Sequence, residues 1–427
     1  MRQLVFKNTF LFLFAGLSLM LSGCYDKGCI DPAASNYDPL ADRDNGNCKY
    51  AFASDEAKKA FAENYAVIAH AMYSDAYDRS EELRQLIHSF VANPTIPGLK
   101  ACQDAWVLAH IPYSQAEVLG FSGSPVNPEE GEALQKRINA WQFTAAHIDY
   151  INDSLASGII NQPAKYPTIT TQLLQDLNNT VDGKRITLGF HALEFLLWGE
   201  DGESVDALSA GKRTFKDYDT SDSTIANADR RGQYLKLCAD QLSADLATLV
   251  NAWSPFSGSN YLRKFQQHSA KKQTRLAITG MVLFGQFELG HDRLLHTLTG
   301  LDPEREESTF SDNTQRDIYF NVKGLNAIFK GRYGKADSTY VEGVSLYDVI
   351  AEQDSSAAFE LRDLMQSVVD ASIQIPDPYD YHVSLEQTSG QGPITTLHVA
   401  LEKFGSRLTE VATALNMGIQ KDLPLEG

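Results

Sequence analysis

The sequence predicts an all-α protein built from two related helical bundles. From Ala53 onward, apolar residues recur three and four positions apart, which is the period of a helix with one buried face. Stretches that alternate polar and apolar residues, as half-buried strands do, are few. The helical body contains about 375 residues. Because a single core rarely serves so long a segment, we expect two bundles packed together.

Nine segments carry the helical pattern most clearly. In chain order they are Asp55 to Phe90, Gly98 to Leu119, Glu132 to Leu155, Ile169 to Asn178, Thr187 to Trp198, Arg230 to Trp253, Ala270 to Leu298, Ser355 to Ile373 and Thr395 to Leu415. The most polar interruption, residues 199–229, is rich in Gly, Ser, Asp and Lys. We therefore expect the first bundle to span residues 51–205 and the second 206–427.

The first residues predict export and lipidation. Arg2 and Lys7 precede an apolar run that ends in Leu21-Ser22-Gly23-Cys24 and is too short to span a bilayer comfortably. The run resembles bacterial lipoprotein signals, which implies removal of residues 1–23, acylation of Cys24 and attachment to the outer membrane through lipid. A secreted soluble protein cut elsewhere is the alternative.

The charge of the chain excludes some partners. Loss of Arg2 and Lys7 with the signal moves the formal net charge from −18 to −20. No basic patch with interleaved aromatic residues occurs, which argues against nucleic acid and against electrostatic binding to anionic lipid. Cationic ligands suit an acidic protein, although an acidic surface also serves solubility alone.

The cysteines agree with an oxidising compartment. Cys29 and Cys48 bracket a segment with too few apolar residues for a core, and we expect them to pair and close a module of residues 24–50. The segment resembles short Asp- and Asn-rich modules of bacterial surface proteins, which implies a calcium loop with oxygen donors from Asp42, Asp44 and Asn45. A disulfide-closed spacer without calcium is the alternative. Two further cysteines, Cys102 and Cys238, are expected to be buried free thiols.

The most informative segment is Gly189 to Gly199, which places one imidazole and one carboxylate in an otherwise apolar helix. His191 and Glu194 are three residues apart, so they share a helix face and can converge on one ion or substrate group. A buried carboxylate is costly unless it is paired, protonated or ligated. A metal site would satisfy both groups. A structural His–Glu hydrogen bond and acid–base chemistry are the alternatives.

The second half repeats this pattern in reverse order. Glu288 and His291 are also three residues apart in an apolar segment. If the halves are related bundles, facing helices would bring His191, Glu194, Glu288 and His291 to one metal site, as in di-metal bundles. Glu288 and His291 lying near the surface is the alternative.

These segments resemble the imelysin family. The resemblance rests on Gly189-x-His191-x-x-Glu194 followed by Phe-Leu-Leu-Trp-Gly, on Arg137-Ile138-Asn139-Ala140-Trp141 with Ile148-Asp149-Tyr150, on Phe310-Ser311-Asp312-Asn313-Thr314 with Asp317-Ile318, and on Glu288 with Arg293. It covers residues 50 to 415 and implies two helical bundles with shared polar residues at their junction. The chain departs from the family where Glu307, Thr309 and Gln315 stand around the Ser-Asp-Asn-Thr segment, because a histidine and a cysteine are common there.

The resemblance implies further binding residues at this junction. Arg137 and Arg293 are candidates, although Arg137 pairing with Glu194 or Asp149 is as compatible with the sequence. Ser311, Asp312 and Asn313 are candidates too, with helix capping or turn formation as the alternative.

The family implies two kinds of function. One is a surface protein that binds iron, a related transition metal or a metal-containing ligand for uptake, and the other is a zinc-dependent extracytoplasmic peptidase. The residues favour binding, because the chain has no His-Glu-x-x-His segment to supply zinc ligands and a general base together. A third interpretation is a metal-free docking site for an uptake receptor.

Overall fold

The computed structural model describes residues 27–30, 37–41, 43–46, 54–130, 133–141, 144–151, 156–178, 185–201, 210–300 and 306–419. Contacts along the chain divide it into two compact units, Met1–Ala51 and Phe52–Gly427. The expected signal at residues 1–23, Cys24, Asp42 and Cys48 lie outside the described residues. The lipid anchor, the Cys29–Cys48 disulfide and the calcium loop therefore stay predictions.

The first unit contains a short parallel strand pair. β1 (Lys27–Gly28) pairs with β2 (Arg43–Asp44), and Cys29 beside it is buried. Of the expected calcium donors, Asp44 accepts a hydrogen bond at Oδ1 from the Gly46 backbone N–H at 2.9 Å. The Asn45 backbone N–H donates to the carbonyl of Gly28 at 3.0 Å. These bonds hold the described part of the loop against β1.

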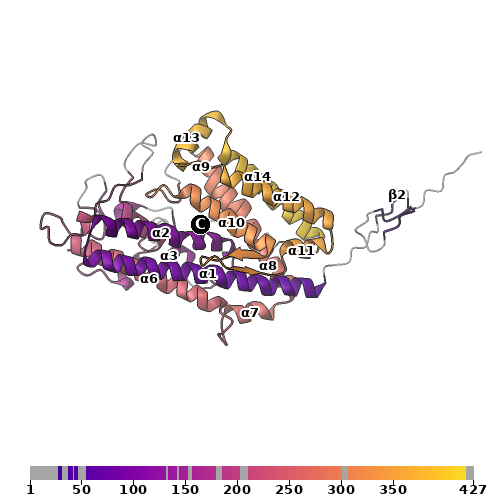
Figure 1. The fold of residues 1–427 in the computed structure, drawn as a ribbon, viewed down its shortest axis with the longest axis horizontal. Helices are drawn as coiled ribbons and strands as arrows, with labels where there is room; N and C mark the ends of the chain where they lie inside the picture. The colour runs from indigo at the N-terminus through magenta and orange to yellow at the C-terminus, as the bar shows by residue number, and fades with distance from the viewer. Residues whose placement is uncertain are drawn as a thin grey trace, which may run out of the picture. The chain divides into compact units, whose positions relative to one another are not determined.

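The second unit is helical, which confirms the predicted class (Figure 1). Its elements are α1 (Asp55–Ala92), α2 (Ile96–Ala116), η1 (Glu117–Leu119), α3 (Gln135–Ile138), η2 (Ala145–His147), α4 (Thr171–Leu177), α5 (Phe190–Trp198), η4 (Phe215–Tyr218), α6 (Ala228–Trp253), α7 (Tyr261–Gln267), α8 (Ala270–Val282), the π-helix η5 (Leu283–Leu295), α9 (His296–Thr299), α10 (Thr314–Lys330), β3 (Arg332–Gly334), β4 (Tyr340–Glu342), α11 (Leu346–Ala351), α12 (Ser355–Ile373), α13 (Tyr379–Ser389) and α14 (Pro393–Ala414). None of the described helices is both long and apolar enough to cross a bilayer.

The long helix α1 connects two groups of helices. It packs against α2 and α6 of the first group, and α2 in turn packs against α5. It also contacts α8, α11 and the antiparallel β3–β4 hairpin of the second group, in which α10, α12, α14 and η5 pack together. Figure 1 shows α1, α2 and α6 running alongside one another, with α12 and α14 stacked over α10.

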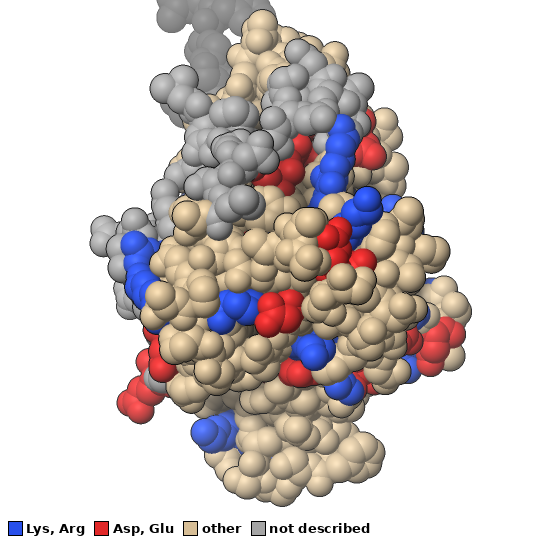
Figure 2. Space-filling model, turned by 90° about the vertical axis from the view of Figure 1, so that its left-hand side faces the viewer, with Lys and Arg blue, Asp and Glu red and all other residues tan. Residues whose placement is uncertain are grey.

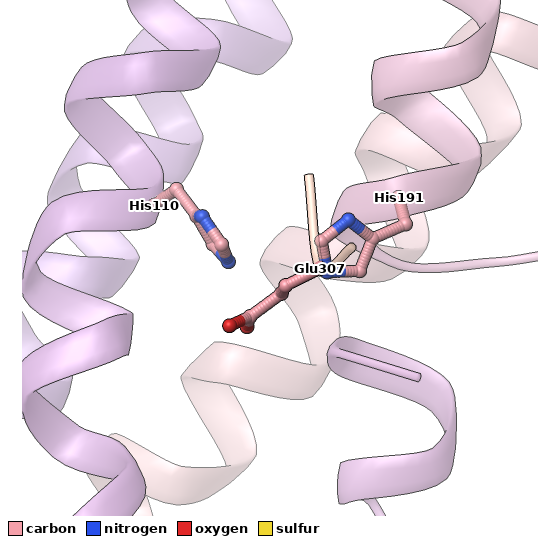
Figure 3. A group of neighbouring side chains, drawn as sticks. All are labelled: His110, His191 and Glu307. Atoms are coloured by element: carbon pink, nitrogen blue, oxygen red, sulfur yellow. The ribbon is translucent and has the colours of Figure 1, made fainter. Parts of the chain in front are cut away.

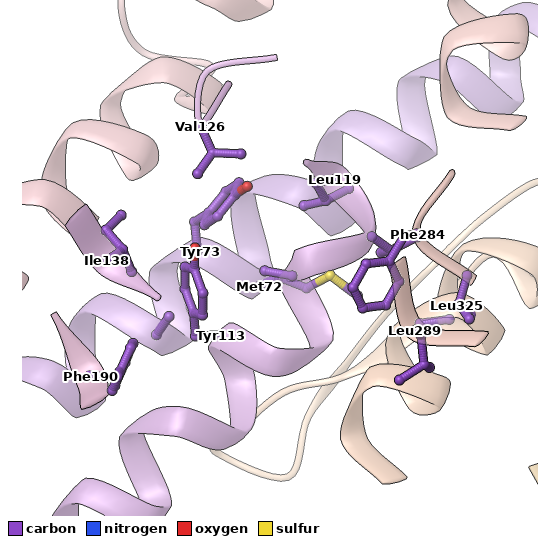
Figure 4. Close-up of a cluster of buried hydrophobic side chains, with 14 of the residues drawn as sticks. Met72, Tyr73, Tyr113, Leu119, Val126, Ile138, Phe190, Phe284, Leu289 and Leu325 are labelled. Carbon is purple, nitrogen blue, oxygen red and sulfur yellow. The ribbon is translucent and has the colours of Figure 1, made fainter. Parts of the chain in front are cut away.

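One apolar core runs through both groups. Figure 4 shows Met72 and Tyr73 of α1 among side chains of α2, α5, η5 and α10. Phe284, Leu289 and Leu325 from the second group are all buried there. Burial of apolar area, the main stabilising contribution to folding, is therefore shared between the groups.

Several predicted elements differ from the structure. Residues 355–373 form α12 as predicted, but the helix expected at residues 132–155 is wrong for the described part, which holds only α3 and the single turn η2. The reason is tertiary: buried Asp149 in that segment forms ion pairs with Arg213 at 2.9 Å and Arg231 at 2.6 Å. The sequence analysis also missed α7, α10, α11, α13 and the β3–β4 hairpin.

The division into bundles at residue 206 stays a prediction. Residues 202–209 lie outside the described part. Helix α6, which follows the expected boundary, packs against α1 and α5 of the N-terminal half. If the two bundles are divided according to which helices pack together, the boundary comes after α6 and not before it.

The two groups approach most closely where α10 crosses α2. A Cβ placed on Gly324 of α10 would lie 2.1 Å from the carbonyl oxygen of Gln115 in α2, far inside van der Waals contact. The contact involves backbone atoms that no side-chain rotation can move. Glycine at this position therefore fixes the distance between the two helices.

We expect Gly324→Ala to lower the free energy of unfolding by about 1–3 kcal/mol, because the methyl group would force the two helices apart. In an unobstructed helix the same change would stabilise by up to about 1 kcal/mol. Thermal denaturation followed by circular dichroism measures the effect, with Gly258→Ala, where a Cβ meets nothing within 4 Å, as the control. An unchanged or higher melting temperature for Gly324→Ala would contradict the close approach.

Candidate metal centre

The glycine of the Gly-x-His-x-x-Glu motif is required by its backbone. Gly189 precedes α5 with φ of +93°, a conformation that residues with a side chain rarely adopt. A Cβ on Gly189 would lie 2.5 Å from the carbonyl oxygen of Ile138 and 2.6 Å from that of Arg137. The glycine therefore lets the segment of Arg137 and Ile138 pass against the start of α5, which places Asn139 in the site.

His191 and Glu194 are hydrogen-bonded to each other inside the protein. Both are buried, and His191 Nδ1 lies 2.8 Å from Glu194 Oε2. The other carboxylate oxygen, Oε1, accepts from the backbone N–H groups of Phe310 at 3.1 Å and Ser311 at 2.9 Å and from the Ser311 hydroxyl at 2.7 Å. The two oxygens of Glu194 thus have four hydrogen-bond partners.

The bond to Glu194 determines what the rest of the imidazole offers. In the neutral tautomer whose Nδ1–H donates a hydrogen bond to the carboxylate, His191 has a lone pair on Nε2. That atom is buried and has no hydrogen-bond partner. A buried imidazole nitrogen without a partner is costly in a finished core, and it is the state in which histidine binds a metal ion.

A second histidine faces the same point from α2. His110 is buried, and its ring centroid lies 5.4 Å from that of His191. Its Nδ1 contacts Asp317 Oδ1 at 2.9 Å and its Nε2 contacts Asn139 Oδ1 at 2.9 Å. Burial lowers the pKa of His110, but the charges of Asp317, Glu307 and Glu117 outweigh it and raise the pKa to about 9.

Glu307 provides the third group. It is buried, and its carboxylate accepts hydrogen bonds from Arg293 at 2.5 Å and from the side-chain amide of Asn139 at 3.2 Å. Burial raises its pKa to about 8, with Arg293 opposing the shift. One ligand atom from each of His110, His191 and Glu307 lies within 4.8 Å of the other two, and Figure 3 shows the three side chains pointing toward one another.

Arg293 joins this group to a wider polar network. Its guanidinium donates to Glu117 at 2.9 Å, to Glu288 at 2.7 Å and to Glu307. Glu288 and Arg293 are five residues apart, and they meet because η5 is a π-helix, in which residues at that spacing lie on one face. The charges of Glu117, Glu307 and Glu288 raise the pKa of Arg293 above its usual value despite burial.

Carboxyl groups outnumber cationic groups in this buried cluster. The carboxylates of Glu117, Glu194, Glu307 and Asp317 are all buried, whereas the buried cationic groups of the network are Arg293 and His110. Glu288 adds a further carboxylate that is about a third exposed, at 34% of its side-chain surface. An excess of buried carboxylates must be balanced by protons or by a bound cation.

The structure gives the other predicted residues mainly structural contacts. Arg137 forms a bidentate ion pair with Asp245, with Nε 2.8 Å from Oδ2 and Nη2 2.6 Å from Oδ1, where the sequence suggested Glu194 or Asp149 as partner. Ser311 donates hydrogen bonds from its backbone N–H and its hydroxyl to Glu194 Oε1. Asn313 donates to Asp317 at 2.7 Å. Their roles in ligand binding stay predictions.

Asp312 lies beside this loop in an acidic environment. It is half-buried, with a positive φ of 53°. Burial, followed by the charges of Asp201, Asp380 and Asp377, raises its pKa to about 7. Its part in binding also stays a prediction.

His291 does not belong to the buried group. It is 48% exposed and lies beside Asp292 and His296, with its Nδ1 3.2 Å from Asp292 Oδ1. The prediction that His291 and Glu288 share a helix face assumed α-helical spacing. In the π-helix, His291 faces His296 five residues on, while Glu288 faces Arg293.

Sequence reasoning did not single out His110, Glu307, Glu117, Asn139 or Asp317 as site residues, although Asn139 and Asp317 lie in segments that carry the family resemblance. His110 lies in an apolar helical segment, which is the same signal that singled out His191. Glu307 was noted only as a departure from the family pattern. Their convergence depends on contacts between residues as many as 207 positions apart, as for His110 and Asp317.

Comparison with known proteins agrees with this architecture. The imelysin family profile matches residues 69–408. Iron-regulated protein A of Synechococcus elongatus is 22% identical over 335 residues, which cover 77% of this chain and 78% of that protein.

Two solved structures share the fold. A protein named as an iron-regulated protein A precursor from Parabacteroides distasonis superposes with a TM-score of 0.64 at 17% identity, over 86% of this chain and 96% of its own. An imelysin-like protein from Psychrobacter arcticum gives 0.58 at 13% identity, over 86% and 98%.

The raised pKa values predict that the metal-free protein loses stability as the pH rises. Folded Glu307 keeps its proton up to about pH 8, whereas the unfolded chain loses it near 4.5, so stability falls across that interval. The contribution of His110 is complete below pH 6.5 and is lost as the pH rises through about 9. We expect a lower melting temperature at pH 9 than at pH 6 in the presence of chelator.

Glu307→Gln should reduce this fall, because glutamine does not titrate, while Glu63→Gln at an exposed position should leave it unchanged. A melting temperature that rises from pH 6 to pH 9 would contradict the protonated state of the cluster.

Proposed function

Because the chain belongs to the imelysin family, and because its buried cluster holds more carboxylates than cations, we propose that the protein binds a transition-metal ion between His110, His191 and Glu307 for iron uptake. The unpartnered Nε2 of His191 is the observation that carries the proposal. The lipid anchor predicted at Cys24 would hold the protein at the cell surface.

The donor set suits a divalent transition metal. Two imidazole nitrogens and one carboxylate form the combination that non-haem iron proteins use, and zinc accepts the same ligands. Iron is preferred here because relatives carry the name iron-regulated protein A. The three side chains are all buried, which favours a bare ion over a large metal-containing ligand.

The surrounding residues would prepare the ligands. Glu194 orients the ring of His191 so that Nε2 points into the cluster. In metal proteins, carboxylates that are hydrogen-bonded to the other ring nitrogen of a metal-bound histidine have the same role. Arg293 and the Asn139 amide position Glu307. His110 must give up both its Nε2 proton and its contact with Asn139 before it can bind metal. Ion binding therefore releases protons, and affinity should rise with pH.

We expect the purified protein to bind one transition-metal ion tightly and to lose it in the His191→Ala/Glu194→Ala double variant and in Glu307→Gln. Elemental analysis after dialysis measures the content. Since His291, Asp292 and His296 form a second group of possible ligand atoms at the surface, the control is His291→Ala/His296→Ala, which should retain the buried ion. Equal content in wild type and double variant would favour a structural site or metal-free receptor docking.

The peptidase alternative finds less support in the geometry. Zinc-dependent hydrolysis needs a carboxylate that can take a proton from bound water. Both oxygens of Glu194 are already engaged, and Glu117 is bound to Arg293. His110, His191 and Glu307 are also too deeply buried for a peptide chain to reach.

We therefore expect the zinc-loaded protein to cleave unstructured peptides no faster than the His191→Ala variant does. Fluorogenic peptide mixtures and casein provide the assay, with chelator-treated protein as the background. Cleavage that chelator abolishes and His191→Ala removes would establish the peptidase and make Glu288, the most exposed carboxylate of the network, the candidate base.

A further inference from the structure

A separate pocket lies on the molecule between α2, α10 and the β3–β4 hairpin. Its volume is about 560 Å³, within the range of sites for small organic ligands. None of the residues of the buried metal cluster lines it. Every residue of its wall belongs to the described part of the chain.

The wall of this pocket is basic in an acidic protein. Arg79, Lys323, Lys330, Arg332 and Lys335 line it, and no Asp or Glu does, although the chain has 55 acidic and 37 basic residues. On the face shown in Figure 2, by contrast, Lys and Arg side chains are interspersed with Asp and Glu. The pocket therefore concentrates positive charge locally.

Three of these five cations already form an ion pair with a carboxylate. Arg79, Arg332 and Lys335 form ion pairs with Glu82 at 2.7 Å, Glu342 at 3.3 Å and Asp337 at 3.2 Å, all outside the pocket wall.

Lys323 and Lys330 form no ion pair with any described residue. They lie on one face of α10 with Phe320 and Ala327, at spacings of three and four residues. Their ammonium groups remain available to a ligand.

The pocket also contains unsatisfied hydrogen-bonding groups. The side-chain Oδ1 position of Asn326 is buried without a protein partner, and whichever way the amide is turned, one of its polar ends can form a hydrogen bond with a ligand there. Pro112, which also lines the pocket, lies inside α2 and has no N–H to donate to the carbonyl of Leu108 one turn earlier. A finished protein surface rarely leaves such groups in a concave wall.

Aromatic and apolar side chains complete the wall. The guanidinium carbon of Arg332 lies over the ring of Tyr340, 4.1 Å from the ring centroid. Phe320 and Tyr333 also line the wall. Leu108, which is 47% exposed, and Ile111 add apolar surface from α2. A ligand that contacts this wall needs a flat or apolar body as well as negative charge.

We propose that this pocket binds a small organic anion with an aromatic body and a phosphate, sulfonate or carboxylate group. The anionic group lies between Lys323 and Lys330, the ring packs against Tyr340 and Phe320, and Asn326 exchanges a hydrogen bond with a polar substituent. This pocket and the buried metal centre share no residue.

The test uses 8-anilinonaphthalene-1-sulfonate, an aromatic sulfonate whose fluorescence rises on binding, titrated into the full mature protein. Lys323→Glu/Lys330→Glu should weaken binding by about tenfold or more, because it replaces two charge-assisted contacts with repulsion. The matched control, Lys272→Glu/Lys403→Glu, changes the net charge equally at positions outside the pocket and should bind as the wild type does. Phenyl phosphate should displace the probe at lower concentration than inorganic phosphate.

Melting curves establish that each variant is folded, and Lys323→Met/Lys330→Met replaces the glutamate variant if that variant fails to fold. Equal affinity in the pocket and control variants would overturn the proposal, as would the absence of saturable binding to the wild type. Displacement by inorganic phosphate as effective as by phenyl phosphate would overturn the aromatic part of the assignment.

Discussion

The arrangement of the polar core depends on Arg293. This buried guanidinium is bonded to Glu117 at the end of α2, to Glu307 before α10 and to Glu288 one π-turn away. Removing it would leave carboxylates buried without a counter-charge, which is among the costliest changes a core can suffer. The contact with Glu288 depends on the π-helical geometry of η5, since α-helical spacing would turn Glu288 away from Arg293.

Once Arg293 is in place, the motif residues have separate tasks. Gly189 allows the backbone of Arg137 and Ile138 to pass close to the start of α5. Glu194 accepts a hydrogen bond from His191 and so sets its tautomer, which leaves His191 Nε2 as the unpartnered nitrogen of the motif. The predicted role of Glu194 as a direct ligand is therefore less well supported than a positioning role. Glu307, which stands where the family pattern commonly differs, supplies the carboxylate that faces the open nitrogen.

The sequence was sufficient to predict the helical class and the burial of His191 and Glu194 on one helix, because periodicity and isolated polar residues in apolar segments are local signals. Their part in metal binding stays a prediction. It was insufficient at residues 132–155, where the Asp149 ion pairs with Arg213 and Arg231 override helical periodicity. It also could not reveal η5, since nothing in the spacing of Glu288 and His291 distinguishes a π-helix from an α-helix. His110 enters the site only through packing of α2 against α5 and α10.

The central claim is that the excess of buried negative charge is a cation site with two imidazole ligands. X-ray absorption at the metal edge of the iron- or zinc-loaded protein tests it most directly, because the scattering pattern of imidazole rings distinguishes histidine from oxygen ligands. The account predicts two histidine ligands and at least one carboxylate oxygen, with metal–nitrogen distances near 2.0–2.1 Å for zinc. A shell made of oxygen alone, or one unchanged in the His110→Ala and His191→Ala variants, would contradict it.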